Sequence, residues 1–204
     1  MKKARKKIIG ILGGPGCGKS TAAGVLGKLG CGVIDADRIA HEVIEKAGIK
    51  KELQRCFGSG IINKKGKIDR GKLAEAAFKN RRQVAQLNRI IHPAVLFRIE
   101  QLIGKFNRRR GIKAIVLDVP LLAEIGWTKR CDKLIFVSCS RKNRVKRAEK
   151  NGLFDGNKLK ILEKFQISLD RKKKITENTI DNNAGLANLK RQIAEIFSKF
   201  MENG

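Results

Sequence analysis

The 204-residue sequence contains no tyrosine and a single tryptophan, and aromatic residues make up only 5% of it. Proteins that bind single-stranded nucleic acid stack bases on aromatic side chains, so this sequence offers little material for such a surface. No apolar run approaches the ~18 residues that a membrane-spanning helix needs. The sequence also has no internal repeat and no low-complexity linker. These absences argue against a base-stacking platform, a membrane protein and a repeat protein.

The five cysteines form neither a metal-binding nor a disulfide pattern. They include no C-x-x-C pair and have no histidine nearby, so a structural zinc site is not expected. An odd number of scattered cysteines is typical of reduced thiols in a reducing compartment. The basic stretch 1–7 is followed by only five apolar residues before a glycine-rich loop, so we interpret it as a solvated tail and not a cleaved signal peptide. Both observations favour a cytoplasmic location.

Acidic residues are scarce, since 19 Asp and Glu stand against 46 Lys and Arg and give a formal net charge of +27. Such a surface can bind polyanions, so a nucleic-acid-dependent ATPase is one interpretation. The low aromatic content and the even spread of the charge favour the other interpretation, a generic lysine-rich surface. We therefore expect small-molecule partners, no membrane or nucleic acid as main partner, and a monomer or small homo-oligomer.

The stretch 13–21, GGPGCGKST, fits the phosphate-loop pattern G-x-x-x-x-G-K-[ST] and follows the apolar run 8–12. In such a loop, glycines let successive backbone N–H groups point at phosphate oxygens, and the next helix adds its positive end. The lysine reaches the β- and γ-phosphates, and the following hydroxyl binds Mg²⁺. The sequence thus predicts an ATP site with Mg²⁺, made by Gly14, Gly16, Cys17, Gly18, Lys19, Ser20 and Thr21.

Acidic residues end two other predicted strands. The apolar pair 33–34 leads into Asp35 and Asp37, and the apolar run 115–117 is followed by Asp118. Ligands of open α/β sheets bind at the carboxyl ends of the strands, so these carboxylates are expected beside the phosphate loop. Asp118 would then anchor Mg²⁺ together with Ser20. Asp35 and Asp37 are candidates for a general base or a metal contact, or alternatively for a helix N-cap.

Residues 39–110 show helical apolar spacing and no strong strand pattern. An insert of this size between two strands suits a substrate-binding domain. His92 and Pro93 resemble a helix start, because proline is favoured at the first helical position. Asp69 and Arg70 follow a glycine turn and could serve as a helix cap or offer an arginine to a phosphate.

Residues 141–174 are helical and basic, with 13 Lys and Arg against 4 Asp and Glu. Over a triphosphate site such a segment would act as a lid with hinges at Gly152 and Gly156, while a solvated helix face is the alternative. Strands are also expected at 134–137 and 179–181. A C-terminal helix should then bury one apolar face, formed by Leu186, Leu189, Ile193, Ile196, Phe197 and Phe200.

Together these patterns predict an α/β fold with a parallel sheet that carries the phosphate loop at the carboxyl ends of its strands. The nucleotide-binding core is expected to comprise residues 1–38, 111–140 and 175–204. Residues 39–110 would form the helical substrate domain and residues 141–174 the lid.

The sequence resembles the dephospho-CoA kinase family. The resemblance is carried by motifs that occur in the family's order over nearly the whole chain: the phosphate loop, VIDAD at 33–37, GKIDR at 66–70, LNRIIHP at 87–93, DVPLLAE at 118–124 and TIDNN at 179–183. Very many proteins share the phosphate loop, whereas the other motifs in this order are much more specific. Another small P-loop kinase, acting on a nucleotide or a small alcohol, is the alternative, and the motifs of the helical insert argue against it.

The resemblance implies an α/β fold of the P-loop kinase type, a three-layer α/β/α arrangement with a helical substrate domain and a lid. It also implies that ATP phosphorylates the ribose 3′-hydroxyl of dephospho-CoA, giving coenzyme A and ADP in the last step of coenzyme A biosynthesis. Asp37 matches the aspartate proposed in the family to activate that hydroxyl. Lys19 would stabilise charge on the transferring group, with Ser20 and Asp118 arranging Mg²⁺. The acceptor site would be lined by Asp35, Asp69, Arg70 and His92.

Three positions depart from the family pattern. Cys17 replaces the more usual serine, so its side chain either fills that position or makes the protein sensitive to peroxide, because anion sites favour thiolates. Ala123 stands where an aromatic residue is common. In the lid, the run 150–152 reads KNG in place of a Gln-Arg-Asp-like run. The lid arginine role is therefore assigned to Arg147, with Arg144, Arg141 and Lys150 as alternatives.

Overall fold

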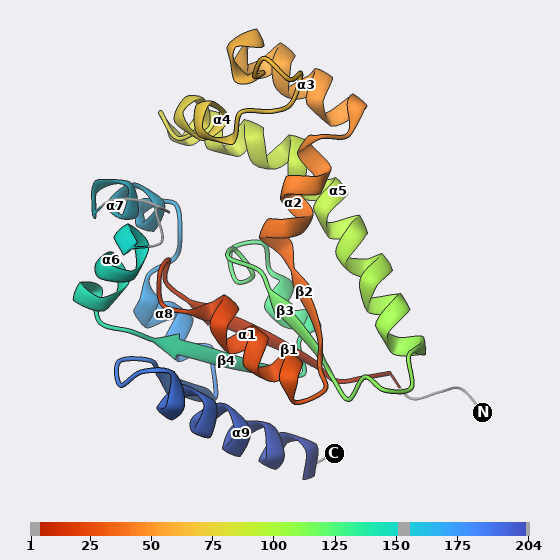
Figure 1. Cartoon of the computed structure of the whole chain (residues 1–204), viewed down its shortest axis with the longest axis vertical. Helices are drawn as coiled ribbons and strands as arrows, with labels where there is room; N and C mark the ends of the chain where they lie inside the picture. Colours follow the sequence, from red (N-terminus) through yellow and green to blue (C-terminus); the bar gives the residue numbers. More distant parts are fainter. Residues whose placement is uncertain (1–4, 151–155, 203–204) are drawn as a thin grey trace. The chain divides into compact units, whose positions relative to one another are not determined.

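Five parallel strands form the central sheet of the computed structural model, which describes residues 5–150 and 156–202 (Figure 1). The strands stand in the order β2-β3-β1-β4-β5. Strands β1 and β3 are buried at every residue, as expected for a parallel sheet covered on both faces. The predicted parallel sheet is confirmed. The strand bounds are β1 Ile8–Gly13, β2 Gly32–Asp35, β3 Ile115–Asp118, β4 Lys133–Ser138 and β5 Asn178–Asp181.

Helices α1 (Lys19–Lys28) and α9 (Leu186–Glu202) cover one face of the sheet and contact each other. The apolar core on this face comes from alternate residues of the strands, among them Ile9 and Ile11, packed against Leu26 of α1 and Ile193 of α9. The predicted burial of Leu186 is wrong, because this first residue of α9 is 52% exposed. The buried stripe of the helix begins one turn later.

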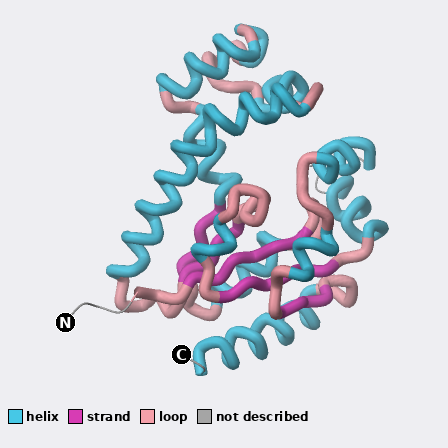
Figure 2. The backbone as a smooth tube through the Cα atoms, turned by 180° about the vertical axis from the view of Figure 1, so that it is seen from behind, coloured by secondary structure: helices cyan, strands magenta, loops and turns pink. Residues whose placement is uncertain are grey.

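Helix α8 (Leu169–Lys174) packs against β1, and the segment after β3 leads into the short 3₁₀ helix η2 (Trp127–Arg130). Leu122 in that segment is fully buried and lies over Gly10, on the face of β1 opposite to Ile9 and Ile11. Helices α6 (Arg141–Lys150) and α7 (Gly156–Lys164) follow β4 and contact each other. Figure 2 shows the strands of the sheet with helices around them. The predicted α/β fold is confirmed.

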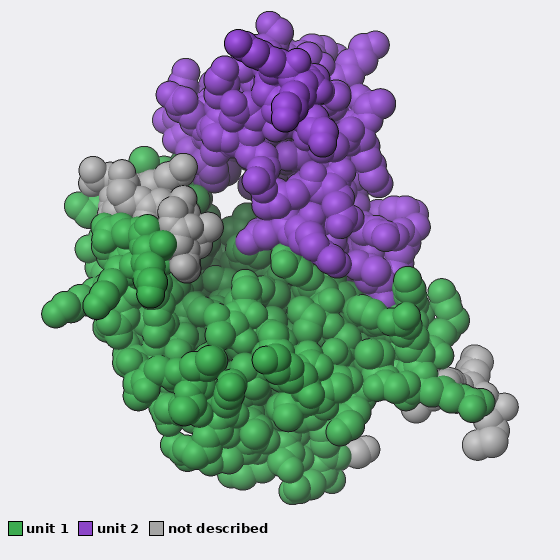
Figure 3. Space-filling view, viewed as in Figure 1, with its two compact units in different colours: residues 1–35, 103–204 green, residues 36–102 purple. Residues whose placement is uncertain are grey.

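Residues 36–102 form a second compact unit, coloured separately in Figure 3, and the first unit comprises residues 1–35 and 103–204. The second unit begins three residues and ends eight residues earlier than the expected helical domain. Residues 141–174 belong to the first unit and are not separated from it. Of the two expected hinges of this segment, Gly152 lies outside the described residues, and Gly156 begins α7.

The second unit has its own apolar core. Ile44, Leu53, Ile61 and Leu73 meet in it, and an isolated antiparallel bridge pairs Ile62 with Ile68. This core lets the unit keep its internal arrangement by apolar packing. Its helices are α2 (Ala36–Ile44), α3 (Ala47–Phe57), η1 (Ser59–Ile61), α4 (Arg70–Ala77) and α5 (Arg81–Arg108), which continues into the first unit.

The predicted helix start at His92 and Pro93 is wrong. Helix α5 begins at Arg81, where the side chain of Asn80 accepts a hydrogen bond from the backbone N–H of Gln83, and it continues through Pro93 to Arg108. Proline inside a helix removes one backbone hydrogen bond. Buried Ile90 precedes it and buried Ile99 follows it, so apolar packing on both sides outweighs that loss.

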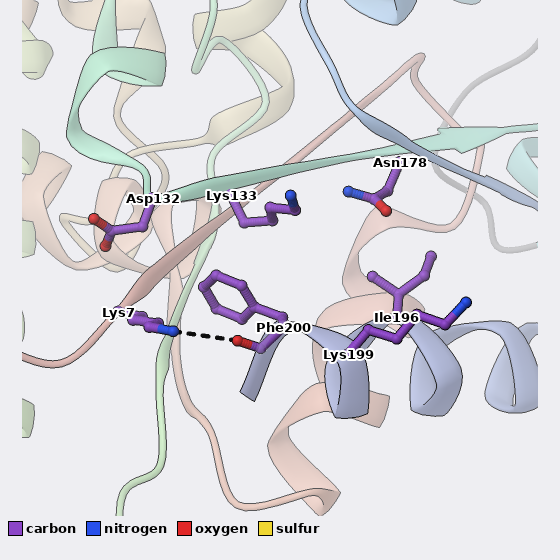
Figure 4. Close-up of a pocket in the computed structure, with 7 residues that line it drawn as sticks. All are labelled: Lys7, Asp132, Lys133, Asn178, Ile196, Lys199 and Phe200. Carbon is purple, nitrogen blue, oxygen red and sulfur yellow. Dashed lines mark hydrogen bonds between the residues drawn. The ribbon is translucent and has the colours of Figure 1, made fainter. Parts of the chain in front are cut away.

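The end of the basic tail is not solvated as predicted. Arg5 forms an ion pair with Asp132 at 2.5 Å, and Lys6 donates hydrogen bonds to Asn107 and to the backbone oxygen of Ile112. Lys7 lies 4.8 Å from the ring centroid of Phe200 and donates to its backbone oxygen (Figure 4). Asp132 also accepts from the N–H of Ile8, so these contacts tie the beginning of β1 to the amino edge of the sheet and to α9.

A hollow of about 460 Å³ lies at this amino edge, opposite to the phosphate loop. Figure 4 shows the residues that line it. Its charged lining is engaged within the protein, since Lys133 pairs with Glu177 and Lys7 with a backbone oxygen. Nδ2 of Asn178 has no hydrogen-bond partner but is inaccessible to solvent. The hollow therefore belongs to the joint between the strand starts and α9.

Candidate nucleotide-binding site

The phosphate loop connects β1 to α1, and its glycines adopt backbone conformations that other residues rarely adopt. Gly16 and Gly18 have φ values of 74° and 94°. A β-carbon on Gly16 would lie 2.8 Å from the backbone oxygen of Arg144, and one on Gly18 would overlap the amide of Asn182. Both glycines are thus required by conformation and by space. Gly18 caps α1 without a side-chain hydrogen bond, which leaves the first backbone N–H groups of the helix to an anion.

Lys19, the first residue of α1, folds back over the loop. Its Nζ donates hydrogen bonds to the backbone oxygens of Gly14 at 3.0 Å and Gly13 at 3.4 Å. The positive charge therefore lies at the mouth of the loop, where a triphosphate would replace these weak carbonyl partners by charged oxygens.

Oxygen-bearing side chains meet beside the loop. Asp35 and Asp118 are register partners at the ends of β2 and β3. Burial raises the pKa of Asp118, and the charge of Asp35 raises it further, while a hydrogen bond from Ser20 and the charge of Lys19 act in the opposite direction. A bound cation would favour the charged form of this buried carboxylate and so oppose the effect of burial.

Asn182, just after β5, supports the backbone of the phosphate loop by a hydrogen bond. It is buried, and its Nδ2 donates a 2.7 Å hydrogen bond to the backbone oxygen of Cys17. Arg147 donates to the backbone oxygen of Asn182 at 2.9 Å and lies 3.5 Å from Sγ of Cys139. The motif TIDNN contains Asn182, but sequence reasoning assigned it no role, because only the fold brings β5 to the loop.

Two of the four candidate lid residues lie at the loop. Arg144 is 4% exposed, pairs with Glu163 at 2.6 Å, and its Nη1 would lie 2.9 Å from a β-carbon on Gly14. Arg147 reaches the loop through Asn182, whereas Arg141 and Lys150 are solvent-exposed. The arrangement therefore reduces the alternatives to Arg144 and Arg147.

Cys17 is 1% exposed, and its Sγ fills the space beside Gly13, where an added β-carbon would lie 2.6 Å away. This packing favours the interpretation of Cys17 as a small filling residue over that of an accessible, peroxide-sensitive thiol. Burial also raises the pKa of Cys31 to about 11 and of Cys131 to about 12, so these two thiols stay protonated near neutral pH.

In the second unit, Asp37 is the second residue of α2 and is exposed. The sequence suggested that Asp37 lies at the end of the strand. In the structure β2 ends at Asp35, and the helix begins at Ala36. A negative charge in the first turn is favoured by the positive end of the helix. The two carboxylates therefore lie on different elements: Asp35 ends β2 of the first unit, and Asp37 lies on α2 of the second unit.

The other predicted acceptor residues have partners inside the second unit. Asp69 caps α4 by accepting a 3.1 Å hydrogen bond from the N–H of Lys72, which is the capping alternative. Arg70 Nη1 lies 2.9 Å from Nδ1 of His41, a histidine that sequence reasoning left without a role. His92 is half-buried in α5, and burial lowers its pKa, which favours the neutral ring.

No helix among residues 5–150 and 156–202 is long and apolar enough to cross a membrane.

Comparison with known proteins shows the family and the fold of the chain. The sequence model of the family described as dephospho-CoA kinase matches residues 7–188. A dephospho-CoA kinase of Fusobacterium nucleatum is 35% identical over 91% of this chain and 94% of its own length. Among solved structures, TT1252 from Thermus thermophilus has a TM-score of 0.77 at 27% identity, covering 96% of this chain and 98% of its own. A dephospho-CoA kinase from Campylobacter jejuni shares the fold, with a TM-score of 0.69 at 23% identity over 96% of this chain and 98% of its own. From the family match and the Fusobacterium relative, this chain belongs to the dephospho-CoA kinase family.

Proposed function

We propose that this chain transfers the γ-phosphoryl group of ATP to the ribose 3′-hydroxyl of dephospho-CoA, giving coenzyme A and ADP. One observation carries the proposal: a phosphate loop with a complete supporting shell lies in a chain of the dephospho-CoA kinase family. The new bond joins the 3′-oxygen to the γ-phosphorus, and the bond between that phosphorus and the β–γ bridging oxygen breaks.

The triphosphate would bind to the backbone N–H groups of Gly14 and of residues 16–21, and to the Nζ of Lys19. Arg147 and Arg144, both at the loop, would neutralise charge on the transferring group. Because phosphoryl transfer needs positioning and charge neutralisation more than covalent chemistry, the rigid supports of the loop contribute directly to the rate.

Ser20 and Asp118 would hold Mg²⁺, with Asp35 close by. Among the described residues, no group of three or more His, Cys, Asp or Glu side chains could hold a metal by itself. This fits magnesium at a nucleotide, which uses one or two carboxylates and completes its shell with phosphates and water. When bound, Mg²⁺ neutralises the phosphate oxygens.

Asp37 would accept the proton of the 3′-hydroxyl as that oxygen attacks, which matches its place in the VIDAD motif. Residues 36–102 would bind dephospho-CoA, with Arg70 and His92 among its contacts and Asp69 in a supporting role at the cap of α4. Residues 141–174 would act as the lid. A cytoplasmic location agrees with five cysteines that are all unpaired.

The test is ADP release from Mg-ATP with different acceptors. We expect turnover with dephospho-CoA and formation of coenzyme A, and none with AMP, adenosine, shikimate or DNA. Turnover with one of the small acceptors alone would replace the acceptor proposed here. ATP hydrolysis stimulated by DNA, without dephospho-CoA phosphorylation, would favour the alternative of a nucleic-acid-dependent ATPase, in which the net charge of +27 serves to bind nucleic acid.

A further inference from the structure

A buried ion pair beside the phosphate loop has no role in the function proposed above. Lys172 of α8 is fully buried, and its Nζ lies 3.0 Å from Oε1 of Glu124 and 2.8 Å from Oε1 of Gln166. Lysine is almost never fully buried unless it is paired. Its neighbours Arg171, Lys173 and Lys174 are exposed, so the burial concerns this one position of a basic helix.

The pair joins two segments that both reach the nucleotide site. Glu124 follows Asp118 by six residues through a tight turn, in which the N–H of Leu122 bonds to the oxygen of Val119 and that of Ile125 to Leu121. Helix α8 packs against β1 and places Leu169 against the phosphate loop, 3.2 Å from where a β-carbon on Gly14 would lie. The ion pair thus links the segment that carries Asp118 to the helix that contacts the loop.

Glu124 joins α8 and the segment before it through one of its two carboxylate oxygens. Its Oε1 also accepts a 3.0 Å hydrogen bond from the N–H of Ile167, while Oε2 is buried without a partner. An apolar pair of similar size would serve stability equally well or better, because buried ion pairs contribute little net stability. A reason other than stability is therefore needed for two charges in this place.

Glu124 also opposes the effect of burial on Lys172. Burial lowers the pKa of Lys172 most strongly, Glu124 raises it, the charge of Lys19 lowers it and Cys17 raises it. Each charge of the pair therefore depends on the other, so the contact between α8 and the segment after Asp118 requires both.

We propose that Lys172 is a positioning residue of the phosphoryl-transfer site, which acts through its ion pair with Glu124 to hold α8 and the segment after Asp118 against the phosphate loop. This inference rests on the proposed kinase activity. It extends the functional residues to two positions that are neither on the phosphate loop nor at the acceptor.

The decisive variant replaces both charges by neutral side chains of similar size, Lys172→Met with Glu124→Gln. Each single change leaves a buried group unpaired and risks misfolding, whereas the double change removes both charges together. Lys173→Met, an exposed position on the same helix, is the matched control. We expect the double variant to keep its Tm within about 3 °C of wild type and its Kd for ATP within about threefold, but to lose roughly 10- to 100-fold in kcat.

A double variant with kcat within about threefold of wild type would overturn the proposal, because the pair would then be a structural strut that neutral packing replaces. A loss of Tm that parallels the loss of kcat would overturn it as well. Wild-type turnover with dephospho-CoA is measured in the same assay. If it is absent, the proposed acceptor fails, and the comparison is repeated with the acceptor that is turned over.

The pH dependence of kcat in the single variant Glu124→Gln adds a measurement that a purely structural role of the pair would leave unchanged. Without the carboxylate, the pKa of Lys172 falls further, because the hydrogen bond and the charge of Glu124 raise it against the effects of burial and of Lys19. The alkaline limb of log kcat should therefore move to lower pH than in the wild type. An unchanged profile contradicts a role for the charge of Lys172.

Discussion

The phosphate loop and the acceptor residues of the second unit are supported in different ways. At the loop, side chains of α6 and α8 and Asn182 after β5 lie against a short backbone segment. A β-carbon on Gly16 would meet a backbone oxygen of α6, and one on Gly18 would meet the buried amide of Asn182. In residues 36–102, Asp69 caps its own helix and Arg70 contacts His41 of the same unit.

This difference follows from what each region presents to its ligand. In the proposed function the loop would bind through backbone N–H groups, whose directions depend on φ and ψ, and so neighbouring elements must hold its conformation. An acceptor region that binds through side chains needs only a stable helical frame to carry them. We therefore expect loop substitutions to act through geometry, and substitutions in the second unit to separate into chemical and structural effects.

The largest effect is expected from Asp37→Asn, because Asp37 is the proposed general base of the second unit. Loss of the general base should lower kcat by roughly 10²–10⁴-fold with the Kd for ATP unchanged, because the amide cannot take the proton. Steady-state kinetics and nucleotide titration measure the two quantities. Glu42→Gln, an exposed change on the same helix, is the control. Turnover within a factor of a few of wild type would remove Asp37 from the mechanism.

The next effect is expected from Gly18→Ala in the loop. The added methyl would overlap the amide of Asn182 in a backbone conformation of φ 94°, and the resulting shift should lower kcat/KM for ATP by about 10²-fold. Gly24→Ala is a matched control, because an added β-carbon there has open space in the same helix α1. It should raise stability by roughly 0.5–1 kcal/mol. Equal kinetics for the two variants would contradict the geometric argument.

A smaller effect is expected from Asn182→Ala. The change leaves the buried oxygen of Cys17 without its donor, which costs about 1–3 kcal/mol of unfolding free energy. Urea unfolding measures this loss, and nucleotide titration should show weaker ATP binding, since the loop loses its support. Normal ATP affinity in a destabilised variant would mean that the loop does not need Asn182 to keep its conformation.

Asp118→Asn should separate stability from function. The folded protein holds the Asp118 pKa above its unfolded value, so the charged carboxylate destabilises the nucleotide-free fold near neutral pH, and this cost disappears as pH falls below the unfolded pKa. The asparagine variant should therefore have a higher Tm than wild type near neutral pH, and the difference should shrink on acidification, while Mg-ATP turnover falls. A lower Tm at neutral pH would contradict the assigned cause of the shift.

The smallest effect is expected at Asp69, where two variants sharpen the comparison. Asp69→Ala removes the cap of α4 and should cost about 1 kcal/mol of stability, whereas Asp69→Asn keeps a capping oxygen and should be nearly neutral. Thermal unfolding gives both values. If the asparagine variant is stable but its KM for dephospho-CoA rises, Asp69 also contacts the substrate. If only the alanine variant is affected, its role is the cap.

Local patterns in the sequence were enough for much of the fold. Apolar residues predicted the strands β1 to β4, because strands of a buried parallel sheet are apolar on both faces. The strand β5 was expected at 179–181, although Ile180 is its one buried residue. The phosphate loop was readable because its chemistry requires glycines, lysine and a hydroxyl at set spacing. The motifs from 33–37 to 179–183 carried the family, which the comparisons support.

Contacts between distant parts of the chain could not be predicted in this way. Proline at position 93 signals a helix start by local preference, but burial on both sides keeps α5 continuous. Asn182 and Lys172 carry no local signal of their contacts, and Arg5–Lys7 read as a solvated tail although they are bound to the amino edge of the sheet.

The sequence by itself determined the phosphate loop, the strands and the helical character of residues 36–102, since these depend on backbone preference and apolar periodicity within a few residues. Only the tertiary structure decided that Asn182 holds Cys17, that Arg144 and Arg147 lie at the loop, and that Lys172 pairs with Glu124. These contacts join residues that are far apart along the chain, and burial away from water makes their hydrogen bonds and charges specific.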